Sequence, residues 1–339
     1  MSLYPADAAA RDRYVLDRRP PRTLHDPWRA QGLLVEDEPA ADGTVARVAT
    51  VFLTGRECPW RCVMCDLWQH TTERDTPPGA IAGQVAAARN TLDQSHELVS
   101  QMKLYNAGSF FDPRAVPDDD YDSVAAGLAG FSRVIVESHP SLIGARTSRF
   151  LETLHRHQTA GIAPPELEVA MGLETAHPEA LERLHKRMTV DGFVRAADRL
   201  RSLGIALRVF LLVSPPFVPE AEQDDWLLRS IDVAFAAGAS VVSLIPTRTG
   251  NGALEALALE NAAWFHPPRL LDLERSLALA LGRRTAPGGR VLADLWDLDR
   301  FADCPHCLGA RRARLRAMNL EQRRLPEQPC PHCGTSPAL

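Results

Sequence analysis

The chain has 339 residues, of which 45% are hydrophobic and 24% are charged, and its formal net charge at pH 7 is −5. This composition predicts a globular protein with a full apolar core, and the acidic balance argues against general attraction to nucleic acid. We find no secretory signal at the N-terminus and no apolar run long enough to span a membrane. We therefore expect a cytoplasmic protein that makes no membrane contact.

Residues 1–46 are rich in Pro, Arg and Asp and lack periodicity, which predicts an extension that wraps or frays rather than a domain. From residue 47, apolar strands alternate with amphipathic helices. The predicted strands are 47–55, 101–112, 133–138, 166–175, 205–216 and 239–247, and the predicted helices are 80–92, 121–131, 148–160, 190–204 and 225–238. Residues 251–302 are expected to be helical and irregular, with a helix at 270–282, and residues 303–339 form a cysteine-rich tail.

Buried strands that alternate with helices predict a parallel α/β array, either a doubly wound sheet or a barrel or part-barrel. In barrels the functional groups lie at the carboxyl ends of the strands. Five of the six predicted strands end in polar or cysteine-bearing segments. The first of these segments is the cysteine loop that follows Gly55. The other four are residues 106–109, Glu137-Ser138, Glu174-Thr175 and 214–216. We expect one mouth of the fold to collect the chemistry.

All seven cysteines lie in three short clusters, which favours metal binding over disulfides in a chain without a signal sequence. The clusters are Cys58/Cys62/Cys65, Cys304/Cys307 and Cys330/Cys333. Three thiolates can hold three corners of a four-iron cubane and leave the fourth iron open to another ligand. The alternative is a zinc ion whose fourth ligand is a distant histidine such as His70.

The segment CPWRCVMC (58–65), placed after the first strand, resembles the cluster motif of the radical S-adenosylmethionine superfamily. This resemblance implies an α/β fold, a partial (β/α)6 TIM-like barrel over residues 47–250. It implies that Cys58, Cys62 and Cys65 bind a [4Fe-4S] cluster whose open iron binds S-adenosylmethionine, with Met64 near the adenine. An electron from an external flavodoxin- or ferredoxin-like donor then cleaves the cofactor, and the resulting radical abstracts a substrate hydrogen.

Further segments resemble the archaeosine-synthase radical subunit family, and the resemblance covers about residues 47–275. These segments are NAGSFFD (106–112), VES (136–138), GLETAHPEALERLHKRMT (172–189), SPPF (214–217) and HPPRLL (266–271). The GLET…HKRMT block is similar, more loosely, to the radical domain of the Elongator catalytic subunit and to oxygen-independent coproporphyrinogen oxidase.

This resemblance implies that Glu174 contacts the cofactor ribose, that Lys186 lies near the methionyl carboxylate, and that Glu137 holds the amino-acid end. The radical S-adenosylmethionine superfamily typically has Gly-Gly-Glu after its second strand, whereas this sequence lacks that carboxylate and offers Asn106 and Gly108 instead. Each residue also has an ordinary explanation as a helix cap, a surface turn or a solvated helix end. The predicted cofactor-binding residues are Cys58, Cys62, Cys65, Met64, Asn106, Gly108, Ser109, Glu137, Ser138, Glu174 and Lys186. Three further side chains could face the substrate, although the sequence does not decide it: Tyr105, Asp112 and Ser214.

The tail contains CPHC twice, and its four thiolates (Cys304, Cys307, Cys330 and Cys333) predict a zinc-ribbon-like Zn²⁺ site. The alternative is an auxiliary iron–sulfur cluster. The Arg-rich segment 310–325 between the two motifs predicts either a solvated helix face or a surface that contacts RNA phosphates. The arginines that would make such contacts are Arg311, Arg312, Arg314 and Arg316.

The function expected from these patterns is radical S-adenosylmethionine chemistry on an unassigned substrate. A small metabolite is slightly favoured, because the net charge is acidic and we identify no RNA-binding module. The first alternative is an enzyme of archaeosine-synthase type that acts on tRNA or a modified base. The second is a non-catalytic iron–sulfur or zinc sensor or adaptor, although a sensor does not require a polar mouth.

Overall fold

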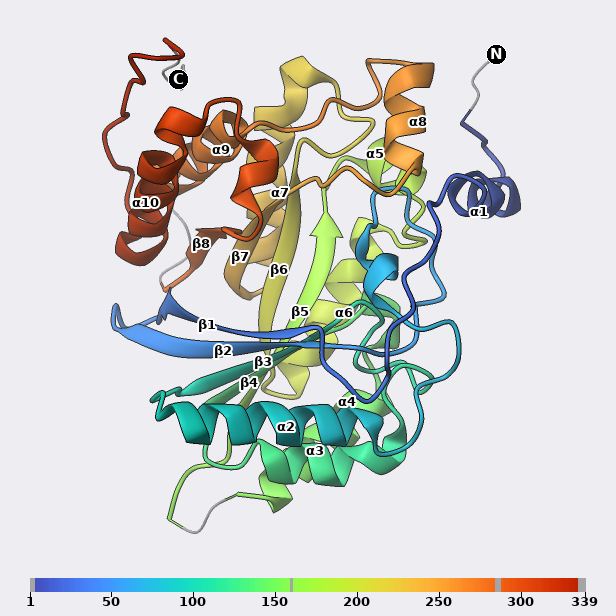
Figure 1. Cartoon of the computed structure of the whole chain (residues 1–339), viewed down its shortest axis with the longest axis vertical. Helices are drawn as coiled ribbons and strands as arrows, with labels where there is room; N and C mark the ends of the chain where they lie inside the picture. The colour runs from blue at the N-terminus through green and yellow to red at the C-terminus, as the bar shows by residue number, and fades with distance from the viewer. Residues whose placement is uncertain (1–3, 159–160, 284–287, 335–339) are drawn as a thin grey trace.

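The computed structural model describes residues 4–158, 161–283 and 288–334, and its strands form one eight-stranded sheet. The strands succeed one another in chain order; β2 to β8 run parallel, and β1 is antiparallel to β2. With β1 and β8 at its edges, the sheet is an open, curled barrel (Figure 1). The strands are β1 (Gly32–Pro39), β2 (Val45–Leu53), β3 (Gln101–Asn106), β4 (Arg133–Glu137), β5 (Glu166–Glu174), β6 (Ala206–Val213), β7 (Ala239–Pro246) and β8 (Arg290–Ala293).

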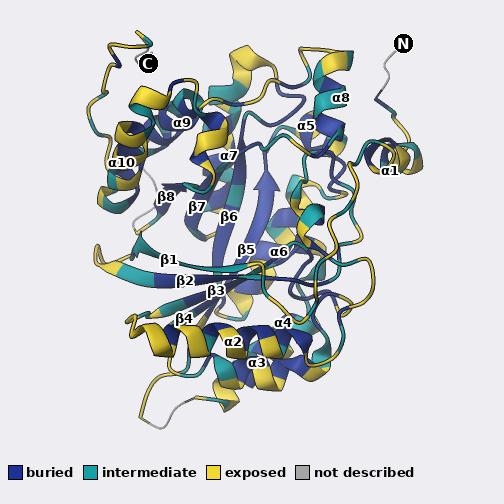
Figure 2. Ribbon diagram, viewed as in Figure 1, coloured by how far each residue is buried: buried dark blue, intermediate teal, exposed yellow. Residues whose placement is uncertain are grey.

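Helices cover the outer face of this sheet, and each has buried residues and exposed residues along its length (Figure 2). The helices are α1 (Ala8–Leu16), α2 (Ala80–Ser95), α3 (Tyr121–Gly127), α4 (Ala145–Arg156), α5 (Pro178–Arg183), α6 (Val190–Ser202), α7 (Gln223–Ala236), α8 (Ala253–Glu260), α9 (Leu270–Gly282) and α10 (Pro305–Glu321). α7 and α9 pack against β6, β7 or β8, and α10 packs against β1 and β8. Among the described helices, none has the length and apolar character needed to cross a bilayer.

The predicted α/β partial barrel is confirmed, and its six predicted strands correspond to β2–β7. The structure adds two strands that the sequence did not predict. β1 and α1 lie in residues expected to form an unstructured extension, and β8 is a four-residue strand in a segment expected to be helical and irregular. The last two residues of the predicted helix 148–160 lie outside the described residues.

Alternation along the strands separates two layers of side chains, because successive residues point to opposite faces of a sheet. The residues that face the helices are apolar and buried, as at Val51, Leu104 and Val209. The intervening residues face the inside of the barrel, and they include aromatic side chains, as at Tyr105, and charged ones, as at Glu137. The main apolar core therefore lies between sheet and helices, and the inside of the barrel also holds polar groups.

A buried network of charges forms the floor of the barrel, at the amino ends of the parallel strands. Because β1 is antiparallel, its acidic end reaches this floor, where Glu38 bonds to Lys103 and, at 2.9 Å, to Arg208. Arg208 also donates to Glu168 at 2.6 Å. Although burial opposes ionisation, Arg208 and Lys103 hold the pKa of Glu38 far below its usual range. The charges of this floor compensate one another. The mouth is the opposite end of the barrel, where the parallel strands have their carboxyl ends.

Candidate active site at the mouth of the barrel

The cysteine loop follows β2 at the mouth and brings three thiols together. Burial raises the pKa of Cys58 to about 11 and that of Cys62 to about 12. Burial also raises the pKa of Cys65, and the charges of Cys58 and Cys62 raise it further. Thiols in this state are protonated, and they become thiolates when a metal takes the place of the protons.

Glu57, which directly precedes Cys58, fixes the start of this loop through three arginines. Arg19 and Arg61 lie 2.9 and 3.1 Å from its carboxylate, and Arg22 bonds to its other oxygen. Arg22 also donates to the Trp68 carbonyl at 3.0 Å. The N-terminal segment, expected only to wrap or fray, therefore binds both ends of the cysteine loop.

Asn251 fixes the far side of the same loop, and the sequence did not single it out. Its buried amide donates to the carbonyls of Val63 at 2.8 Å and Cys65 at 3.3 Å, while its oxygen accepts from the Leu254 amide at the start of α8. The sequence signal that could have indicated Asn251 is the segment TRTGNG (247–252), which follows the sixth predicted strand. This is the one strand end that we did not expect to carry functional groups.

Glu174 and Lys186 form a buried ion pair with each other at the end of β5. Glu174 has a left-handed backbone (φ 66°), and the register of β5 against β6 shifts between Gly172 and Glu174. Lys186 also donates to the Gly172 carbonyl at 2.6 Å. A Cβ on Gly172 would lie 2.3 Å from the Lys186 Nζ, so a larger residue here would displace the ends of the paired side chains. The two residues, predicted to touch different parts of a cofactor, therefore act as one unit here.

Asn106 and Gly108 lie in a tightly packed turn at the end of β3. Both side-chain polar atoms of Asn106 are buried without a hydrogen-bond partner among the described residues. A Cβ on Gly108 would lie 2.4 Å from the Arg56 carbonyl, so only glycine fits. Buried amides are normally satisfied, so the Asn106 side chain is suited to bind a ligand.

The remaining predicted residues lie on this turn or elsewhere at the mouth. Ser109 accepts a hydrogen bond at 3.0 Å from the backbone of His139, and Ser138 is buried beside it. The His139 ring stacks on Trp60 of the cysteine loop, with centroids 3.7 Å apart. Burial, and then the charge of Lys186, lower the pKa of His139 to about 3, so its imidazole is neutral. Met64 is half-buried and packs against an apolar cluster that includes α8.

Of the three residues left undecided, Tyr105 lies inside the barrel on β3. Asp112 is buried and accepts from the Arg114 amide at 2.9 Å, which is a turn-forming role. Ser214, at the end of β6, has φ 56° and borders, with Glu174, a cavity of about 370 Å³. His70, considered as a distant zinc ligand, is exposed, and its ring lies 6.0 Å from that of His25.

Glu137, at the end of β4, is half-buried, and its side chain has no hydrogen-bond partner among the described residues. Burial raises its pKa to about 8; Lys186 opposes this shift and Glu174 adds to it. The carboxyl group is therefore mostly protonated at neutral pH, and a nearby cation would favour its ionised form.

We expect Glu137→Gln to remove a pH dependence of stability. The folded pKa lies above the unfolded value, so the native state binds more protons and the free energy of unfolding falls as pH rises from about 4.5 to about 8. A shift of this kind contributes about 1.4 kcal/mol per pKa unit. Urea unfolding of the cluster-free protein from pH 5 to 8.5 should show the variant gaining stability relative to wild type by a few kcal/mol. A difference that stays constant with pH would contradict this assignment.

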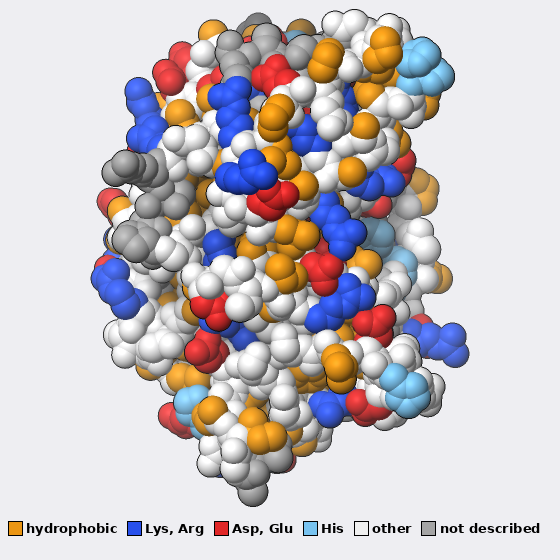
Figure 3. All heavy atoms as spheres, turned by 90° about the vertical axis from the view of Figure 1, so that its left-hand side faces the viewer, with side chains coloured by type: hydrophobic (Ala, Val, Ile, Leu, Met, Phe, Trp, Pro, Cys, Tyr) orange, Lys and Arg blue, Asp and Glu red, His pale blue; other side chains and the backbone are white. Residues whose placement is uncertain are grey.

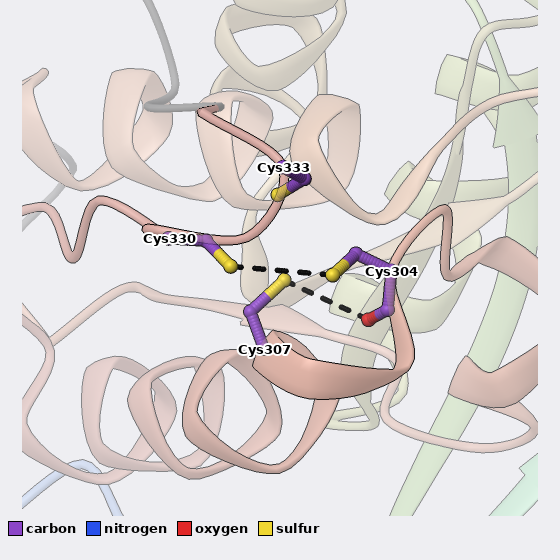
Figure 4. A group of neighbouring side chains, drawn as sticks. All are labelled: Cys304, Cys307, Cys330 and Cys333. Atoms are coloured by element: carbon purple, nitrogen blue, oxygen red, sulfur yellow. Dashed lines mark hydrogen bonds between the residues drawn. The ribbon is translucent and has the colours of Figure 1, made fainter.

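The four tail cysteines form a second candidate metal centre (Figure 4). Their sulfur atoms all lie within 4.8 Å of one another, and the Sγ atoms of Cys304 and Cys330 are 4.0 Å apart. The Cys304/Cys307 pair lies at the start of α10, and the Arg311 Nε donates to the Cys307 sulfur at 3.2 Å. The predicted convergence of the four cysteines is confirmed, and the group could bind a metal.

Both interpretations of the tail arginines, a solvated helix face and an RNA-contacting surface, are wrong for two of the four. Arg311 and Arg314 are buried, and both bind Glu274 of α9. The other two are exposed and also paired: Arg312 lies 3.0 Å from Asp299, and Arg316 lies 2.8 Å from Asp37. Figure 3 shows basic and acidic side chains interspersed on one face of the molecule, and none of its patches is purely basic.

Comparison with known proteins places these features in context. No known family model matches the chain. It is 23% identical over 282 residues to the archaeosine synthase subunit beta of Methanosarcina acetivorans, covering 80% of this chain and 76% of that protein. It is 25% identical over 238 residues to the subunit of the same name from Thermococcus kodakarensis, covering 69% of each.

Among solved structures, the chain is similar to a radical SAM methyltransferase from Sphaerobacter thermophilus. The TM-score is 0.51 at 15% sequence identity, and the match covers 83% of this chain and 78% of the other. The fold is therefore that of radical S-adenosylmethionine enzymes. Together with the two named relatives, this likeness confirms the resemblance expected from the sequence, both to the superfamily and to the archaeosine-synthase family.

Proposed function

We propose, from this resemblance in fold and sequence, that the chain is a radical S-adenosylmethionine enzyme that removes a hydrogen atom from its substrate. In this proposal Cys58, Cys62 and Cys65 bind a [4Fe-4S] cluster. Once bound, the cluster supplies the single electron that cleaves S-adenosylmethionine and so initiates hydrogen abstraction. The observation that carries the proposal is a loop with three closely spaced cysteines at the mouth of an open parallel barrel, together with an unsatisfied buried amide at the end of the neighbouring strand.

The neighbouring residues fit the cofactor's methionyl end. The Asn106 amide has a free donor and a free acceptor, which match a carboxylate and an ammonium group. Glu137 gains its negative charge when an ammonium group lies beside it. Lys186 contributes a buried positive charge, and Glu174 holds that charge in place. In the same proposal, four more residues belong to the cofactor site: Met64, Gly108, Ser109 and Ser138.

The proposal is tested by loading the protein with iron and sulfide without oxygen, reducing it with dithionite and adding S-adenosylmethionine. We expect 5′-deoxyadenosine to form, together with a change in the electron paramagnetic resonance spectrum of the reduced cluster when the cofactor binds. A protein that keeps its cluster but forms no 5′-deoxyadenosine would favour the sensor hypothesis. In the cell, we propose that the electron comes from an external flavodoxin- or ferredoxin-like donor.

A second candidate function is action on tRNA or a modified base. It is favoured by the two relatives named archaeosine synthase subunit beta. The tail does not add support, because its arginines are paired within the chain. Filter binding of tRNA at several salt concentrations distinguishes this substrate from a small metabolite, since phosphate contacts weaken steeply with salt.

We also propose that the tail binds one Zn²⁺ ion. An ion with Zn–S distances of about 2.3 Å places its four sulfurs about 3.8 Å apart, which agrees with a group contained within 4.8 Å. Thiolates that bind a cubane are held farther apart, because each binds a different iron. The compact arrangement therefore favours a single ion over an auxiliary cluster.

We expect the purified chain to contain about one zinc and, after cluster loading, four irons. Cys330→Ser should lower zinc to near zero and the melting temperature by a few degrees, because a structural metal stabilises the fold that it binds. Elemental analysis and thermal unfolding test this. A count of eight irons and no zinc would instead establish a second cluster.

A further inference from the structure

The inside of the barrel, between its charged floor and its mouth, carries a layer of aromatic side chains. Phe52 of β2, Tyr105 of β3 and Phe210 of β6 occupy inward-facing positions, since their strand neighbours belong to the outer core. Trp296, just after β8, completes the layer: its ring centroid lies 4.9 Å from that of Phe52 and 6.2 Å from that of Tyr105. Tyr105 and Phe210 are 5.9 Å apart.

The layer rests directly on the floor. The Lys103 ammonium lies 5.9 Å from the centroid of the Tyr105 ring, and the Trp296 indole nitrogen donates to Glu36 at 3.4 Å. Below, Lys103 is itself paired with Glu36 and Glu38. The charges beneath the rings are thus paired with one another, and the floor presents little net charge to a molecule above it.

The aromatic side chains of the layer retain exposed surface. All four aromatic side chains are only half-buried, although they lie inside the fold. The Tyr105 hydroxyl has no hydrogen-bond partner in the part of the chain that the structure describes. In the strand register, Glu137 of β4 lies level with Tyr105, and its carboxyl group is likewise without a partner there. Aromatic rings with free surface, beside two polar groups that lack partners, are the composition of a ligand pocket.

We propose that Tyr105, Phe210 and Trp296 form the bed of the substrate site, and that the substrate presents a flat, uncharged heteroaromatic ring to them. This inference rests on the proposed function, because the hydrogen donor must lie inside the barrel next to the cysteine loop. The ring stacks on the aromatic bed, while the Tyr105 hydroxyl bonds to a polar atom at its edge. An aliphatic or strongly charged substrate would leave both kinds of contact unused.

The test uses the cluster-loaded full chain, with S-adenosylmethionine added in excess so that it occupies its own site. Calorimetric titrations measure the binding of three flat-ring probes (guanosine, cytidine and tryptophan) and of ribose as a control without a ring. We expect at least one ring probe to bind saturably and ribose not to bind. Trp296→Ala should weaken that binding by about 10-fold, as the loss of one stacking partner does. Trp296→Phe should restore most of it, and Trp226→Phe on the outer helix α7 is the matched control.

Cluster content and circular dichroism, measured on each variant, identify one that has failed to fold. In that case Tyr105→Phe and Phe210→Leu replace it as milder changes to the same bed. The proposal is overturned if none of the three ring probes binds, or if Trp226→Phe weakens binding as much as Trp296→Ala. Failure of the proposed function is a separate result, namely ring binding without any 5′-deoxyadenosine formed under dithionite.

Discussion

Replacement of Cys62 by alanine is expected to abolish 5′-deoxyadenosine formation. Cys62 is buried in the centre of the loop, between the two other thiols that form the candidate cluster site. The loss should exceed the roughly 10–100-fold that removing a partner outside the ligand shell of a metal typically costs. Product formation is measured by chromatography after anaerobic reduction, and iron is counted on the same samples.

The matched control is Cys307→Ala, which removes a thiol from the tail instead of the loop. It should lower the zinc content while leaving about four irons and product formation near the wild-type rate. Comparable iron loss in both variants would mean that the two cysteine groups share one site, and it would contradict the separation proposed here. Circular dichroism of Cys62→Ala should remain native, because the lost sulfur leaves only a small cavity.

The strands that were predicted correctly are those that local sequence signals define. Runs such as 205–216 are apolar, follow a glycine and end at prolines, and these features are readable without knowing any distant partner. β1 lacks such a signal, because its acidic residues face Lys103 and Arg208, which lie 65 and 170 positions away from Glu38. A charged strand is stable here only because the barrel supplies those cations.

The same limit explains the errors and omissions at the sites. In the sequence, Arg311 and Arg314 resemble residues of a solvated basic helix. In the structure they are buried because both bind Glu274, about forty positions earlier in the chain. Asn251 is one amide in a glycine-rich loop, and its importance depends on the cysteine loop almost 190 positions away. The cysteines themselves were predictable, since metal ligands of one loop are close in sequence and their spacing is constrained.

The ion pair of Glu174 and Lys186 shows how a site residue can be named correctly while its contact is not. Twelve positions separate them, and α5 lies between, so the sequence offered two independent ligands for a cofactor. The bulge at Gly172 turns Glu174 back toward the lysine. A bound cofactor then contacts a pair that is already ordered. Binding therefore loses less conformational entropy than it would with two separate flexible side chains.

Lys186→Met is therefore expected to be the most destabilising single change at the mouth. It leaves Glu174 buried without its cation, and Glu137 loses the positive charge that limits the rise of its pKa. Breaking a buried ion pair in this way typically costs about 3–5 kcal/mol. Urea unfolding at pH 7 measures the free energy of unfolding, and equilibrium dialysis measures the affinity for S-adenosylmethionine, which should also fall.

The double variant Lys186→Met/Glu174→Gln separates lost pairing from general disruption. With both charges removed, the free energy of unfolding should recover part of the loss, whereas cofactor affinity should not recover if both groups serve the ligand. Arg201→Met is the matched control, because its pair with Asp198 is exposed and should contribute less than about 1 kcal/mol. Equal destabilisation by Arg201→Met and Lys186→Met would show that the buried pair contributes no more to the free energy of unfolding than an exposed pair does. Additive effects of the two mouth substitutions would show that Glu174 and Lys186 do not act as a unit.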